Sequence, residues 1–333
     1  MMKKTAIFSL LLALAMLASA CSPAKMEIAP TLPPVPTAVP TQVPTIPAPT
    51  ASIPPAPTAI PTQIPTSLPP TQVTSALTID VLKNAEYKLP QSNKTVKLAG
   101  GSFKAGSGAD YVDANLLDKV AFGDLNGDGR PDAVVLLAEN AGGSGTFISA
   151  VVILDENGQP VQSGSALIGD RVKITSLTIQ PDRKIVLTGT IHGPNDPMCC
   201  PTFQVTETYQ LSKSGLELVR LTSQTPLGKE RAINIESPAN AAQVSDSVEV
   251  KGNVSISPFE NNLVYRIYDG TGKKWAEGPI QVKSAEMGGP GTFDTTIDIS
   301  NIPAGLLIRL EILDLSVADG STLAMDSVEL LVK

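Results

Sequence analysis

A proline-rich stretch sets the first limit on what this chain can fold into. Residues 23–74 consist almost entirely of Pro, Thr, Ala, Val, Ile, Gln and Ser, and the block PTAVPTQVPT at 36–45 returns as PTAIPTQIPT at 57–66. Proline fixes φ and lacks a backbone N–H, so neither a helix nor a central strand can run through this stretch. We expect residues 21–75 to form a disordered Pro/Thr-rich stalk of polyproline II type, on the order of 150 Å long if fully extended. The alternative is a proline-rich ligand for another domain.

The segment ahead of the stalk indicates where the protein goes. Residues 1–20 begin with a basic pair, continue as an apolar run and end in small residues, which is typical of a secretory signal peptide and too short for a transmembrane helix. The motif ASAC at 18–21 resembles the lipobox of bacterial lipoproteins, although Leu17 stands one place earlier than usual. The resemblance implies cleavage before Cys21, acylation of Cys21 with chains such as palmitate, and an extracytoplasmic protein lipid-anchored to the cell membrane. Each acyl CH₂ buried in lipid contributes about 0.8 kcal/mol to that anchoring. The alternative is a secreted protein with an unmodified cysteine.

The remaining chain has the composition of a mainly β protein. The formal net charge of the whole chain is −7 and no basic cluster is present, which argues against a nucleic-acid partner. Short runs alternate Val, Ile, Leu or Thr with polar residues, as strands do; examples are 172–180, 184–191, 203–211, 248–254 and 263–269. One modest helix is expected around 76–87. A polar segment at 223–232 divides a β-rich domain, 76–225, from a second domain, 231–333.

The second domain has the strand count of an immunoglobulin-like β-sandwich. About seven short strand candidates follow one another in about a hundred residues. The segments INIESPANAAQVSDSVEVKGNV at 233–254, LVYRIYDGTGKKWAEG at 263–278 and GTFDTTIDI at 291–299 resemble the bacterial spore germination immunoglobulin-like domain. The resemblance implies a binding or spacing module and brings no catalytic residues with it. Trp275 is expected to pack in the core or half-buried against it, and the alternative is a ligand-stacking role.

An acidic loop in the first domain has the spacing of a calcium site. The segment FGDLNGDGRPD presents oxygen donors at alternate positions, from the side chains of Asp124, Asn126, Asp128 and Asp132 and the carbonyl of Arg130. Alternating oxygens suit Ca²⁺, and glycines let the chain curl around an ion. The loop is not an EF-hand, because position 12 is Val135 inside an apolar run. It resembles the calcium loops of FG-GAP repeats, which implies those five ligands and a structural ion, although one copy makes no propeller. The alternative is an Asp/Asn/Gly turn without metal.

The segment HGPNDPMCCPT at 192–202 contains the single histidine and two adjacent cysteines. Adjacent Cα atoms lie about 3.8 Å apart, below the usual disulfide range of about 4.4–6.8 Å. Three interpretations stay open: a vicinal disulfide between Cys199 and Cys200, a pair of structural thiols, and a reactive or metal site with His192 and Asp196. The loop GDLNGDG, the segment LIGDRV at 167–172 and GPNDPMCCPT together resemble an uncharacterised class of bacterial exported domains, which implies no activity.

These patterns predict a non-catalytic binding or scaffold module on the cell envelope, with a cell-wall glycan or another envelope protein as partner. Sequence signatures of hydrolases and metalloproteases, such as G-x-S-x-G and H-E-x-x-H, are absent from the chain. The alternative function is an extracytoplasmic enzyme or redox protein that uses His192, Cys199 and Cys200.

Overall fold

The computed structural model describes residues 77–333, and the predictions for the signal segment, Cys21 and the stalk lie outside the described residues. Within the described part, twenty-one strands accompany a single short α-helix and two turns of 3₁₀ helix. The mainly β fold predicted from the sequence is therefore confirmed. No helix among residues 77–333 is long and apolar enough to cross a membrane.

The described part of the chain begins with a small cap made of α1 (Ile79–Lys83), β1 (Glu86–Lys88) and β2 (Thr95–Lys97). Thr78 caps the helix, since its hydroxyl accepts a hydrogen bond from the Val81 N–H at 3.2 Å. The helix expected over 76–87 is shorter than predicted, because Tyr87 is a buried strand residue. Its hydroxyl donates to the Leu82 carbonyl at 2.8 Å and so fixes the strand against the helix.

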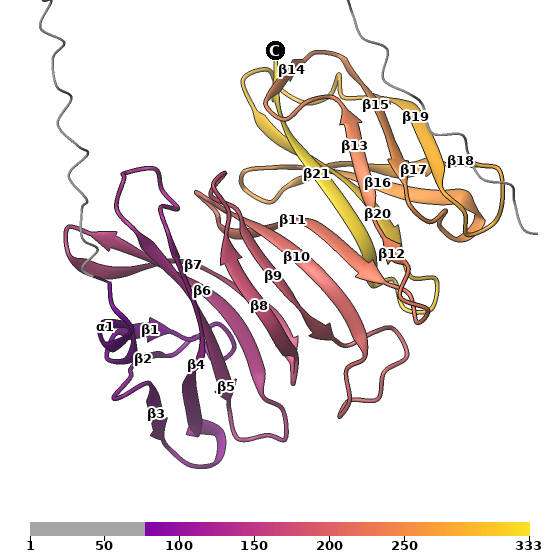
Figure 1. The fold of residues 1–333 in the computed structure, drawn as a ribbon. Coiled ribbons are helices and arrows are strands. Elements are labelled where there is room, and N and C mark those ends of the chain that lie inside the picture. The colour runs from indigo at the N-terminus through magenta and orange to yellow at the C-terminus, as the bar shows by residue number, and fades with distance from the viewer. Residues whose placement is uncertain (1–76) are drawn as a thin grey trace, which may run out of the picture. The chain divides into compact units, whose positions relative to one another are not determined.

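The cap covers one face of a five-stranded antiparallel sheet (Figure 1). Its strands are β3 (Ser102–Ala105), β4 (Val112–Gly123), β5 (Asp132–Asn140), β6 (Phe147–Glu156) and β7 (Gln159–Asp170). The central strand β5 is buried on both faces. Val135 and Leu137 pack towards the cap, whereas Val134 and Leu136 pack into a second core on the other face. Burial on both faces explains why AVVLL at 133–137 is continuously apolar instead of alternating.

A second sheet layer covers that other face. It contains β8 (Lys173–Ile179), β9 (Ile185–Ile191), β10 (Phe203–Ser212) and β11 (Gly215–Gln224). The first three fall on the runs predicted as strands at 172–180, 184–191 and 203–211. Ile185, Leu187 and Tyr209 point from this layer into the shared core.

The C-terminal residues form a β-sandwich (Figure 1). One sheet contains β13 (Ile233–Ser237), β15 (Ser247–Val254), β19 (Gly291–Asp298) and β18 (Lys283–Ser284). The facing strands are β17 (Lys274–Gln281), β16 (Asn262–Asp269), β20 (Leu307–Leu315) and β21 (Thr322–Val332), with β14 (Ala242–Val244) parallel to β21. Their aliphatic side chains make one core, against which the half-buried Trp275 packs as expected.

Strand pairing continues from the first domain into the second. β11 pairs with β21 through Arg220 opposite Asp326 and Leu221 opposite Met325, so that one ten-stranded sheet contains strands of both domains. Arg220 and Asp326 also form an ion pair at 3.1 Å. The Ser223 hydroxyl donates to the Leu323 carbonyl at 2.6 Å. The polar segment between the domains, with β12 (Glu230–Arg231), is thus not their sole connection.

Candidate functional sites

The candidate residues of the first domain lie at two opposite ends of its strands. At one end, the β4–β5 loop contacts the β6–β7 turn, where Arg130 Nη1 donates to Asn157 Oδ1 at 3.3 Å. At the other end, the β5–β6 loop, the end of β7 and the β9–β10 loop meet at Arg171, which binds Ser144 and Met198. The acidic loop and the cysteine loop are therefore separate sites, and the structure does not bring them together.

Asp132 fixes the acidic loop to the sheet. It is the first residue of β5 and is fully buried. Its Oδ2 accepts the Leu125 N–H at 2.8 Å, and its Oδ1 accepts the Asp155 N–H at 2.9 Å. Burial raises the pKa of Asp132, against hydrogen bonds from backbone N–H groups that lower it. Asp132 therefore positions the loop and also joins it to β6.

Asp124 and two glycines shape the tip of the loop. The Asp124 carboxylate accepts the Gly127 N–H at 2.6 Å through Oδ1 and the Gly129 N–H at 3.0 Å through Oδ2. Gly127 and Gly129 have φ values of +84° and +83°, which other residues resist. A side chain on Gly127 would also meet a neighbour, since an added Cβ would lie 2.5 Å from Nη1 of Arg183. The glycines predicted to let the loop curl thus do so.

The remaining donors of the loop bind one another. Asn126 Oδ1 accepts the Asp128 N–H at 2.9 Å, and Asp128 Oδ1 accepts the Arg130 N–H at 2.8 Å. Asp128 Oδ2 lies 2.6 Å from Nη2 of Arg130, in an ion pair. The backbone hydrogen bond from Arg130 is the largest influence on the pKa of Asp128, which is lowered.

The residue types of this loop fit calcium, but their arrangement in the structure does not gather them around a point. The carboxylates of Asp124, Asp128 and Asp132 turn to N–H groups of the protein. Within residues 77–333, no three His, Cys, Asp or Glu side chains are placed to hold a metal ion. The guanidinium of Arg130 supplies positive charge beside Asp128. Hydrogen bonds and the Arg130–Asp128 ion pair help to close the loop, and calcium stays a prediction based on its donor set.

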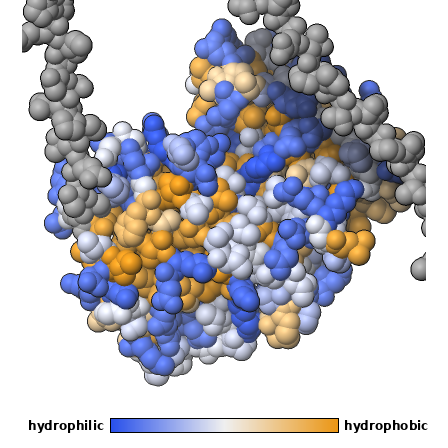
Figure 2. All heavy atoms as spheres, viewed as in Figure 1, coloured by the Kyte–Doolittle hydropathy of each residue, from blue (hydrophilic) through white to orange (hydrophobic). Residues whose placement is uncertain are grey.

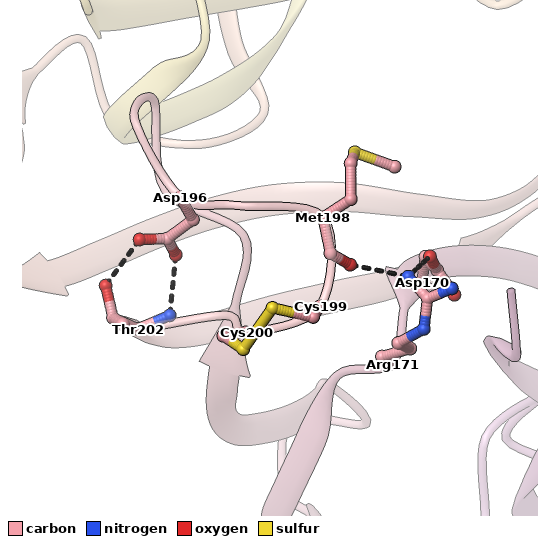
Figure 3. Close-up of a disulfide and its surroundings, with 7 residues drawn as sticks. All are labelled: Asp170, Arg171, Asp196, Met198, Cys199, Cys200 and Thr202. Atoms are coloured by element: carbon pink, nitrogen blue, oxygen red, sulfur yellow. Dashed lines mark hydrogen bonds and ion pairs between the residues drawn. A yellow bond between two sulfur atoms is a disulfide. The ribbon is translucent and has the colours of Figure 1, made fainter.

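The cysteine loop contains a vicinal disulfide. Cys199 and Cys200 are bonded in the structure, with Cα atoms 3.8 Å apart (Figure 3). Asp196 closes the loop, since Oδ2 accepts the Gly193 N–H at 2.8 Å and the Thr202 N–H at 2.6 Å. These backbone hydrogen bonds, with one from the Thr202 hydroxyl, lower the pKa of Asp196. Asp196 was a candidate for a reactive or metal site with His192. In the structure, its carboxylate instead accepts the hydrogen bonds that close the loop.

No catalytic arrangement forms around the histidine in the described part of the chain. His192 Nε2 is buried and makes no hydrogen bond there. A cavity of about 580 Å³ adjoins the loop and is lined by residues such as Pro194, Phe203 and Arg231. Neither His192 nor either cysteine is among the described residues that line it. The enzyme or redox alternative at this loop stays a prediction.

Arg171 is a structural residue that the sequence analysis did not identify. It follows β7 with a left-handed φ of +50°, and its Nη1 donates to the Met198 carbonyl at 2.5 Å (Figure 3). Nη2 donates to the Ser144 carbonyl at 2.5 Å, and Asp170 pairs with the same guanidinium at 2.6 Å. Arg171 thereby joins the cysteine loop to the β5–β6 loop. The segment LIGDRV at 167–172 contains both Asp170 and Arg171. An Asp–Arg pair that follows an apolar residue pair and a glycine was the signal in the sequence that could have indicated a structural role.

A groove of about 640 Å³ lies beside the β5–β6 loop, and nothing in the sequence analysis predicted it. Its lining residues come from the β3–β4 connection and from β4, β5 and the β5–β6 loop: Gly106, Ser107, Gly108, Tyr111, Asp113, Asn115, Ala138, Asn140, Gly142, Gly143 and Thr146. On the face shown in Figure 2, hydrophobic residues gather over the region of β5–β7, with hydrophilic residues around them. The groove differs from that surface because its lining consists of four glycines, six residues with polar side chains and one alanine.

Comparison with known proteins bears on the C-terminal sandwich. No curated protein matches the chain. The family model described as the immunoglobulin-like domain of bacterial spore germination matches residues 232–321, which include β13 to β20. The resemblance read from the sequence is thus confirmed for this domain, and residues 232–321 are similar to the immunoglobulin-like domain of bacterial spore germination.

Proposed function

We propose that this protein is a lipid-anchored protein of the cell envelope that acts as a non-catalytic binding or scaffold module. The observation that carries the proposal is the similarity of residues 232–321 to an immunoglobulin-like domain, and the pairing of β11 with β21 links that domain to the first domain in one sheet. Backbone hydrogen bonds between strands hold two modules more firmly than a flexible linker does. Such an arrangement suits a protein that presents a binding surface at a fixed position relative to its neighbour module.

The anchor and the partner follow from the parts outside the described residues and from charge. Acylation of Cys21 would place the protein on the outer side of a membrane, and residues 21–75 would lift the folded part away from it. The net charge of −7 favours a neutral or basic partner over nucleic acid. We propose a cell-wall glycan or another envelope protein as that partner.

A structural calcium ion at the acidic loop is part of the proposal. The side chains of Asp124, Asn126, Asp128 and Asp132 and the carbonyl of Arg130 would hold it. An ion there would relieve repulsion between carboxylates and stabilise the folded state by mass action. The competing possibility is a metal-free turn in which Arg130 and the backbone N–H groups satisfy the same carboxylates.

Fractionation of cells that make the chain tests the anchor. The wild-type protein should sediment with membranes, and its intact mass should equal a chain that starts at Cys21 and carries acyl groups. The Cys21→Ser variant should leave the membrane fraction. Cys199→Ser is the matched control, because it changes another cysteine in the same way and should keep the anchor. An unmodified Cys21, or membrane association of Cys21→Ser, would overturn the lipoprotein assignment.

Saturable binding tests the module itself. The Cys21→Ser chain should bind isolated envelope material up to a plateau and should be competed by excess unlabelled chain. Binding that rises without saturation at all concentrations would contradict a specific partner.

A further inference from the structure

The glycine-rich groove at the β3–β4 end of the first domain carries an inference about ligand chemistry. We propose that this groove binds a neutral sugar ring through adjacent hydroxyl groups. The proposal rests on the proposed binding function and names the ligand class of one site. The volume of about 640 Å³ lies within the range of about 300–1,000 Å³ that is usual for small-ligand sites.

The charge of the groove selects a ligand that donates hydrogen bonds. Asp113 is the one ionisable carboxylate among the described residues that line it, and no Lys, Arg or His is among them. An anionic ligand would therefore meet a carboxylate without a lining cation. At the rim, Lys104 Nζ lies 3.3 Å from Asp113 Oδ2 and offsets its charge. A neutral hydroxyl donor thus suits the groove better than a second ammonium group does.

Asp113 is already oriented for this task. Asn115 Nδ2 donates to Asp113 Oδ1 at 2.7 Å, and the Tyr111 hydroxyl lies 3.3 Å from Oδ2. Desolvation works to raise the pKa of Asp113, but hydrogen bonds from Asn115 and Lys104 outweigh it and lower that pKa. The side chain therefore remains a carboxylate. A carboxylate offers about four lone-pair positions, so the donors from Asn115, Tyr111 and Lys104 leave about one position for a ligand hydroxyl.

Glycines shape the two loops beside the groove. Gly106 and Gly142 have φ values of +78° and +91°. A Cβ added to Gly106 would lie 2.2 Å from the Asp110 carbonyl oxygen, and one added to Gly142 would lie 3.2 Å from the Gly108 carbonyl oxygen. Gly106 therefore permits the tight turn of the β3–β4 connection itself, and Gly142 permits the close approach of the β5–β6 loop to that connection. Tyr111, which also lines the groove, supplies an aromatic ring with an apolar face and a polar tip.

Hydrogen bonds hold the wall of the groove in place before any ligand binds. Asn140 Oδ1 accepts the Gly142 N–H at 2.9 Å, and its Nδ2 donates to the carbonyls of Gly143 at 3.0 Å and Gly145 at 2.6 Å. Arg171 holds the same loop through the Ser144 carbonyl. A site formed in advance loses less conformational entropy on binding than a loop that must close.

An oligosaccharide array tests the proposal directly. Detergent-solubilised full-length protein should bind neutral oligosaccharides of two to six sugars on a printed array that also contains anionic oligosaccharides and peptides. Calorimetric titration with the oligosaccharide that binds most strongly then measures the variants. Asp113→Asn and Tyr111→Ala should each weaken binding about tenfold or more, because each removes a hydrogen-bonding or stacking partner.

Asp182→Asn is the matched control, since Asp182 is an exposed carboxylate paired with Lys184 in the β8–β9 turn. It should change the affinity less than about twofold, in keeping with the small contribution of exposed ion pairs. Thermal melting checks that each variant folds, and Asn115→Ala replaces any variant that does not. The proposal is wrong if no neutral oligosaccharide binds, if anionic glycans or peptides bind in preference, or if the groove variants bind like wild type. A blank array with saturable binding to envelope material would remove the sugar site and leave the proposed function standing.

Discussion

A buried carboxylate in β10 provides a sharp prediction about how stability depends on pH. Glu207 is only 5% exposed, and its neighbours across the sheet are Leu187 on β9 and Leu221 on β11. One hydrogen bond within the protein reaches it, from the Tyr209 hydroxyl at 2.9 Å. Desolvation raises the pKa of Glu207 to about 7, because that one hydrogen bond lowers it by less than burial raises it.

The direction of the effect follows from which state holds the proton. Between pH 4.5 and about 7, folded Glu207 keeps a proton that the unfolded chain releases, so stability falls as pH rises. Below pH 4.5, the ordinary pKa of a glutamate, the contribution of Glu207 to stability is fully present, and above about pH 7 that contribution is lost. At about 1.36 kcal/mol for each pH unit, the rise in the pKa of Glu207 from 4.5 to about 7 corresponds to a loss of about 3 kcal/mol.

Glu207→Gln removes the titration while leaving an oxygen that can accept the Tyr209 hydrogen bond. Urea unfolding of wild type and variant at pH 5, 6, 7 and 8 measures the free energy of unfolding. The wild type should lose about 2.5 kcal/mol more than the variant between pH 5 and pH 8. The new amide N–H₂ group costs about 1–3 kcal/mol at every pH, so the slopes and not the absolute values are compared.

Glu156→Gln is the control, because Glu156 is exposed and the chemical change is the same. Its pH slope should equal that of the wild type. Equal slopes for wild type and Glu207→Gln would refute the reasoning, since they would mean that Glu207 is solvated in the folded state.

Three further predictions concern the acidic loop and two arginines. If calcium binds, EDTA should lower the melting temperature and Ca²⁺ should restore it, because ligand well above its Kd adds a few kcal/mol to the free energy of unfolding. Asp128→Ala should abolish the response, and a melting curve that neither addition shifts would support the metal-free turn. Arg171→Ala should speed amide hydrogen exchange in the β5–β6 and β9–β10 loops at least tenfold while core strands stay protected; unchanged exchange in both loops would contradict its role as their joint anchor. Arg231 pairs with Asp314, whose side chain is only 4% exposed, and burial raises the pKa of Asp314 against that partner. Arg231→Met should cost about 3–5 kcal/mol in urea unfolding at pH 7, and adding Asp314→Leu should recover part of it; a double variant no more stable than the single one would show that the unpaired charge is not the cause.

The fold was predictable where the alternation of apolar and polar residues indicates which face of a strand is buried. The alternating runs at 172–180, 184–191 and 203–211 are strands because each puts one face against a core. The helix expected over 76–87 shows the limit of that reasoning. The helix ends at Lys83, the chain enters β1, and the Tyr87 hydroxyl of that strand bonds back to the Leu82 carbonyl.

Long-range contacts could not be read from spacing. Arg171 and Met198 lie 27 residues apart, and Leu221 meets Met325 across the domain boundary. The residues around Arg171 and Leu221 contain no local pattern that indicates which distant residue each one contacts. The groove was missed for the same reason, because the β3–β4 connection and the β5–β6 loop meet only once Asp113 pairs with Asn140 in the sheet. Glu207 occupies an inward position between Val205 and Tyr209, and that irregularity in an apolar face was visible in the sequence.

The central claim is that the protein binds envelope material without changing it. The measurement is a binding isotherm of the Cys21→Ser chain on isolated envelope material, followed by chemical analysis of the material recovered after prolonged incubation. We predict a saturable isotherm and recovered material with no new chain ends and no released fragments. Absence of saturation, or fragments that accumulate in proportion to the protein added, would contradict the claim.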